Sequence, residues 1–153
     1  MRAGTARIGV YDSRAIAVAF VGSEAHDQWL RKLMADVATA KTAGDQKRVK
    51  ELESEGSRAQ QQLHQQGFST APVDNLLKHV EDRLPAIRKE AGVSTLISKW
   101  DKDGLAKYPG AEQVDVTLSL VKAFHPNERQ LKSAAEVQKH QPIPLDKARK
   151  IKD

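Results

Sequence analysis

The chain has 153 residues, a formal charge of +5 and no cysteine, and 39% of its residues are hydrophobic. This length suits one domain with a modest core, and the lack of cysteine excludes disulfides, thiol catalysis and cysteine metal ligands. The cations are interleaved with almost as many acids, which predicts a solvated surface rather than a specific nucleic-acid site; only residues 147–152 form a basic cluster.

Residues 7–12 form a β-prone run that contains Ile8, Val10 and Tyr11, which predicts a strand. Alanine and aliphatic residues follow over 13–20, which predicts a buried helix packed against that strand and closed by Gly22. The apolar run 15–21 resembles the core of a secretory signal, but it is short and Asp12 lies just before it. We therefore interpret it as mature protein and expect any export signal to have been removed. No run approaches the length that spans a membrane.

Residues 23–67 predict two amphipathic helices folded back on each other at Ala43-Gly44-Asp45. Ser23 is placed to cap the first helix, Gly44 to end it in a left-handed conformation, and Asp45 to cap the second. Apolar or small residues recur every three or four positions, as in a coiled-coil seam. Folding at the turn pairs large residues with small ones: Ala40 with Val49, Val37 with Leu52, Leu33 with Gly56, and Leu30 with Ala59.

The segment 67–72 should end the second helix, after which Ser69 or Thr70 can cap another that carries Leu76, Leu77, Val80, Leu84 and Ile87. Pro85 should kink or divide that helix, and Gly92 should end it. A second strand is expected over 93–100, a polar turn over 101–104, and a third strand over 105–108. Residues 114–117 then lead into a helix over 118–124 that is capped by Asp115 or Thr117. Pro126 fits the first turn of a surface helix over 127–140, and an extended connector with a last basic turn follows.

The residues that could carry chemistry do not converge on a site. The five histidines lack metal-ligand spacing, although the helix pairing would bring His26 near His64. Asp101 and Asp103 imitate the start of a calcium loop without its later ligands, and no phosphate loop or nucleophile elbow is present. We therefore predict a protein that is not an enzyme and that has no cofactor and no metal site.

The expected fold class is α+β and mostly helical. It comprises a small sheet body (7–22 and 73–124), a projecting antiparallel coiled-coil hairpin (23–67) and an additional C-terminal helical tail (125–153), within a single domain.

The order of elements over 7–124 resembles the Skp/OmpH family of periplasmic chaperones. The resemblance rests on the opening strand and helix at Ile8-Gly-Val-Tyr-Asp12, the helical hairpin, the helix end Lys89-Glu-Ala-Gly92, the strand at 94–98, Tyr108, and Val114-Asp-Val-Thr-Leu-Ser-Leu-Val-Lys122. It implies a trimer in the periplasm or cell envelope, whose bodies associate while helical arms hold unfolded or outer-membrane protein clients. This chain differs in its shorter arms and in the segment 125–153.

This resemblance assigns roles to two groups of residues. The face that would meet a client or partner comprises Trp29, Leu30, Leu33, Val37, Val49 and Leu52, and the body that would form the oligomer contains Ile8, Val10, Ile97, Val114 and Val116. Basic residues such as Arg31, Lys32, Lys41, Lys47 and Lys50 could attract acidic clients or anionic lipid headgroups. The alternative is a structural scaffold or adaptor that binds one specific partner through the hairpin or the C-terminal tail.

Overall fold

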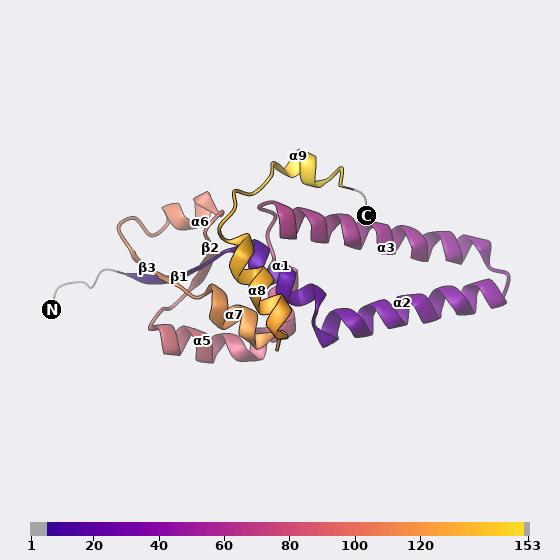
Figure 1. The fold of residues 1–153 in the computed structure, drawn as a ribbon, viewed down its shortest axis with the longest axis horizontal. Coiled ribbons are helices and arrows are strands. Elements are labelled where there is room, and N and C mark those ends of the chain that lie inside the picture. Colours follow the sequence, from indigo (N-terminus) through magenta and orange to yellow (C-terminus); the bar gives the residue numbers. More distant parts are fainter. Residues whose placement is uncertain (1–5, 152–153) are drawn as a thin grey trace.

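The computed structural model describes residues 6–151 and is mostly helical, with one small sheet (Figure 1). This confirms the expected α+β class at that level. The elements in chain order are β1 (Arg7–Tyr11), α1 (Ser13–Val21), α2 (Glu24–Thr42), α3 (Gln46–Phe68), α4 (Asp74–Leu77), the 3-10 helix η1 (Lys78–Arg83), α5 (Leu84–Ala91), β2 (Leu96–Ser98), α6 (Lys102–Ala106), β3 (Glu112–Asp115), α7 (Thr117–Ala123), α8 (Glu128–Val137) and α9 (Leu145–Ala148). Within the described residues, no helix has the length and apolarity to cross a membrane.

The sheet has three parallel strands in the order β2-β1-β3, so that β1 lies in the centre. Val10 of β1 is in register with Ile97 of β2 and with Asp115 of β3. Because successive side chains alternate between faces, Ile8 and Val10 pack with Ile97 on one face, whereas Tyr11 belongs to the main core on the other. Because the three strands are parallel, their carboxyl ends meet at one edge of the sheet.

Helix α1 forms the centre of the main core. Ala15, Ile16 and Ala19 are fully buried, and the helix packs against α3, α7 and α8. Its sequence of alanine and aliphatic residues explains this position, because a helix that is apolar on most sides has no face for water and small side chains allow close approach. The predicted helix and its end at Gly22 are confirmed.

Helices α2 and α3 run back along each other and extend away from the sheet (Figure 1). Ser23 Oγ accepts the His26 N–H, Gly44 has φ of +70°, and the Asp45 side chain accepts the Arg48 N–H, as the sequence predicts for caps and turn. Ala40, Val49 and Leu52 form a buried cluster with Leu33 and Val37 beside it. A Cβ on Gly56 would lie 3.0 Å from Leu33 Cδ2, so the small residue does face the leucine.

The C-terminal segment is part of the same fold. Helix α8 packs on α1, where Ala134 is fully buried, and a side chain at Gly22 would overlap Gln130. Asn127 and Gln130 form a capping box at the start of α8. Beyond it, the Ile143 N–H donates to the Phe68 carbonyl over 2.9 Å, and α9 lies beside α3.

One strand prediction is wrong, and the bounds of another need correction. The second strand spans only Leu96–Ser98, and residues 105–108 form no strand. Asp101 instead caps α6 by accepting the Gly104 N–H over 2.9 Å, so the predicted turn at 101–104 becomes the first turn of a helix. The third strand is Glu112–Asp115, which pairs in parallel with β1.

Several predicted helix ends also need correction. Helix α3 continues through Gly67 to Phe68, and neither Ser69 nor Thr70 caps the next helix, which begins after Val73. The expected division near Pro85 is confirmed, with a further kink at Val80 where φ is −124°. Val116 occupies the N-cap position of α7, although Asp115 Oδ1 does accept the Thr117 N–H. Helix α8 ends at Val137, and Pro126 precedes it.

Candidate functional site: an apolar groove between two helices

A groove of about 1300 Å³ lies between α2 and α3, with side chains of α1 and α8 completing its lining. Its lining includes Ala17, Val18 and Val21 of α1, His26, Trp29, Leu30, Leu33, Met34, Val37 and Lys41 of α2, Leu52, Glu53, Gly56, Leu63, His64 and Phe68 of α3, and Asn127, Arg129 and Gln130 of α8. The α2 and α3 residues recur at spacings of three and four, so each helix presents one continuous face. The groove is thus a consequence of the amphipathic pattern of these two helices.

Large apolar side chains are exposed along this groove. Val21 is 47% exposed, Leu30 40%, Met34 64% and Phe68 49%, and all four line it. A single exposed apolar residue is common on any protein surface, but a contiguous group marks an interaction site.

The predicted client face lies partly in this groove. Leu30 is exposed, Trp29, Leu33 and Val37 are half-buried, and Leu52 is buried; all of them line the groove. Val49 is buried in the contact between α2 and α3 and is not in the lining. The sequence pattern followed a narrow seam, and Val21, Met34 and Phe68 were therefore missed as groove residues. Their only sequence signal is an apolar residue next to that seam.

The residues proposed for the oligomer body are mostly internal. Ile8, Val10, Ile97 and Val116 are buried within the single chain, and Val114 is half-buried against the main core. Their burial is explained by the sheet and by the helices that cover it.

Two histidines lie in the groove, one on each wall. The His26 ring stacks on Trp29 at 6.0 Å between centroids and meets Phe20 edge-on at 5.4 Å, and the His64 ring is 5.7 Å from Phe68. His26 and His64, which the sequence predicts to lie near each other, thus line the same groove. Among residues 6–151, no group of three or more histidine, aspartate or glutamate side chains is arranged to hold a metal ion.

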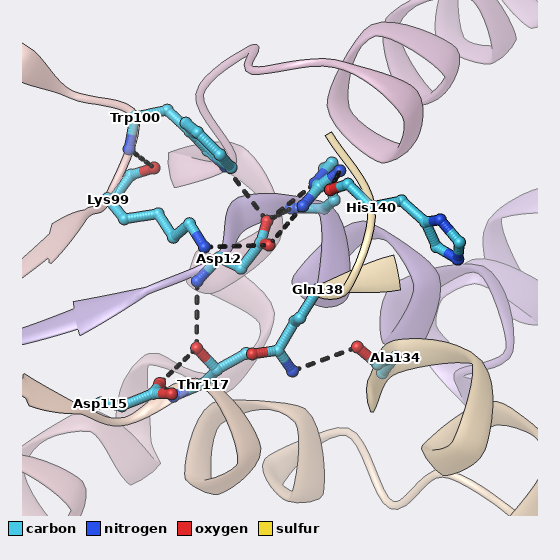
Figure 2. Close-up of polar contacts among 10 residues, drawn as sticks. Asp12, Lys99, Trp100, Asp115, Thr117, Ala134, Gln138 and His140 are labelled. Carbon is cyan, nitrogen blue, oxygen red and sulfur yellow. Dashed lines mark hydrogen bonds and ion pairs between the residues drawn. The ribbon is translucent and has the colours of Figure 1, made fainter. Parts of the chain in front are cut away.

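A second candidate is a polar cluster at the carboxyl edge of the sheet, which Figure 2 shows. Asp12 directly follows β1 and forms a buried ion pair with Arg14, with 2.7 Å between Oδ2 and Nη2. Trp100 Nε1 donates to Asp12 Oδ1 over 3.1 Å, and Lys99 Nζ lies 3.8 Å from Oδ2. The Asp12 N–H donates to Thr117 Oγ1, which in turn donates to Asp115.

The electrostatics of this cluster favour a charged, fully paired Asp12. Burial alone would raise the pKa of this carboxyl, but the hydrogen bonds from Arg14 and Trp100 and the Arg14 charge outweigh burial and lower its pKa below the ordinary value. Burial also raises the pKa of the neighbouring Tyr11, with the charges of Asp74 and Asp101 adding to the effect.

The cluster connects the sheet to the C-terminal segment, and the ion pair at its centre is closed to solvent. Arg14 Nη1 donates to the His140 carbonyl over 2.8 Å, and the exposed fractions of Asp12 and Arg14 are 1% and 2%. These two side chains are paired to each other and to their neighbours. The cluster therefore has a structural role, because it links the end of β1 to the C-terminal segment. We therefore take the apolar groove as the candidate functional site.

Comparisons of the chain with protein-family models, with curated protein sequences and with solved structures find no match.

Proposed function

We propose that this protein is a non-enzymatic, chaperone-like holding protein that binds apolar segments of unfolded or membrane-protein clients in the groove between α2 and α3. In this proposal the two helices act as a short projecting coiled-coil arm. The observation that carries it is the group of exposed apolar side chains along a groove of about 1300 Å³. Each arm contributes a weak contact, and an oligomer that presents several arms would gain affinity by multivalency.

The groove can be tested by placing a charge in it. Met34→Glu should leave the fold intact because this side chain is 64% exposed. It should nevertheless raise the protein concentration needed to suppress aggregation of a urea-diluted outer-membrane protein by roughly tenfold, since bound client would bury the new carboxylate. The measurement is light scattering of the client during dilution.

The matched control is Leu118→Glu, which places the same charge on α7. Leu118 is 46% exposed and lies outside the groove lining, so this variant should suppress aggregation as well as the wild type does. Equal activity of the wild type and Met34→Glu would reject the groove as the client site.

We further propose that the protein acts as a trimer in the cell envelope. The outer edges of β2 and β3 carry no further strand among residues 6–151, so a sheet from another subunit could pair there. We expect multi-angle light scattering to give a trimer mass that stays constant across a dilution series. A stable monomer would contradict this arrangement and would favour the adaptor alternative, in which the groove, or the exposed Lys147, Arg149 and Lys150, contacts one specific partner.

A further inference from the structure

We infer that the groove selects its clients in helical form, and that its occupant is an amphipathic helix with an apolar stripe and acidic residues at both ends. This inference rests on the proposed function, because it names the kind of segment that the groove holds. It follows from the backbone chemistry, the dimensions and the charges of the groove.

The walls of the groove favour a helix because of hydrogen bonding. Both walls are helices, whose backbone N–H and C=O groups are paired internally, and most of the side chains that face the groove are apolar. The backbones of these two helices would offer no partners to the N–H and C=O groups of an extended peptide laid between them, and burying such groups unpaired is costly. A helical occupant satisfies these groups itself and presents only side chains, as in other helix-in-groove complexes.

The dimensions also fit a helix. The volume of about 1300 Å³ is above the range of roughly 300–1,000 Å³ that small-molecule sites usually have. Small residues Ala38 and Ser57 lie in the lining, where large side chains of an occupant can enter. The part of α2 that lines the groove runs from His26 to Lys41, and at about 1.5 Å per residue its length matches an occupant of roughly four to five turns.

The charges of the lining specify the ends of the occupant. Lys41 lies in the last turn of α2, whereas Arg129 belongs to the first turn of α8, near the start of α2, because Gln130 of the same turn contacts Gly22. The two cations therefore mark opposite ends of the groove, and Glu53 of α3 is the third charged residue in the lining. An acidic residue at each end of a bound helix would meet one of these cations.

The probe is a fluorescein-labelled 16-residue peptide with leucine at helical i, i+3, i+4 and i+7 spacing and glutamate at both ends. Its controls are a scrambled peptide of identical composition and a version with lysine at both ends. We expect fluorescence anisotropy with the full chain to give at least tenfold tighter binding of the striped acidic peptide than of the scrambled one, and circular dichroism to show helix gained on binding. Met34→Glu should weaken this binding at least tenfold, and Leu118→Glu should not change it.

The charge component has its own variant. Lys41→Glu/Arg129→Glu should weaken the acidic-ended peptide several-fold and strengthen the lysine-ended peptide. Equal affinities of the two peptides for wild type and for this variant would overturn the assignment of acidic ends.

The outcomes separate this inference from the proposed function. If striped and scrambled peptides bind equally and both are lost in Met34→Glu, the groove holds client chains without selecting helices, and only the inference is overturned. If neither peptide binds although aggregation suppression still depends on Met34, the inference is again overturned. If neither peptide binds and Met34→Glu suppresses aggregation normally, both the inference and the groove function fail.

Discussion

Asp12→Ala is expected to lower the free energy of unfolding by about 3–5 kcal/mol, because it leaves a buried guanidinium without its counter-ion. Arg14 is 2% exposed and loses two side-chain hydrogen bonds in this variant, and α1 loses its capping carboxylate. Urea denaturation followed by tryptophan fluorescence measures the change. The control is Asp36→Ala, which removes an exposed ion pair with Lys32 and should cost about 0–1 kcal/mol. Similar losses of unfolding free energy for both variants would contradict the structural role of the Asp12 cluster.

Replacing both members of the pair distinguishes an unpaired charge from a lost stabilising contact. Asp12→Leu/Arg14→Met should be considerably more stable than Asp12→Ala, because neither buried charge remains. It should not regain full stability, since the cap at α1 and the hydrogen bond to the His140 carbonyl are still absent. A double variant as unstable as Asp12→Ala would show that packing rather than charge dominates.

The same cluster makes the free energy of unfolding depend on pH in the acidic range. The pKa of Asp12 is lower in the folded protein than in the unfolded chain. Its contribution to stability is therefore fully present at pH values above the pKa of the unfolded chain, and it is lost as the pH falls through the pKa of the folded protein. The difference in unfolding free energy between the wild type and Asp12→Ala should therefore be constant above about pH 5 and should shrink below about pH 4.

Features that depend on residues close together in the sequence were predictable from it. Ser23, Gly44 and Asp45 act at the positions where the caps and the turn were expected, because a cap needs only a suitable side chain next to the helix. The small residue Gly56 faces Leu33 because the turn fixes the pairing of the two helices. Short strands were less predictable: β3 was read as the approach to a helix, since its four residues have no apolar alternation and gain their conformation by pairing with β1.

The sites depended more on tertiary structure. Asp12 lies one residue beyond a predicted strand, but its importance arises only when β2 brings Lys99 and Trp100, and β3 brings Thr117, to the same edge. In the groove, the exposure of Met34 and Phe68 depends on how far the two helices are covered by the rest of the chain. No periodicity in the sequence specifies that coverage.

The second prediction of a large loss of stability concerns α8, whose polar sequence suggested a tail outside the sheet body. Ala134→Glu is expected to destabilise the protein by more than about 3 kcal/mol, because the new carboxylate would be buried without a partner and its extra volume would strain the contact with α1. Ala134 is fully buried in the main core, among residues of α1 and α7. Urea denaturation monitored by circular dichroism provides the measurement.

Ala135→Glu is the matched control, since it makes the same substitution at the next position of the same helix, where the side chain is exposed. It should change stability by about 0.5 kcal/mol or less, because surface substitutions away from caps and networks have small effects. A large difference between the two variants would show that α8 completes the core that supports the base of the groove. Equal and small effects would instead mean that α8 folds as an appendage, and Arg129 could then no longer be placed at a fixed end of the bound helix.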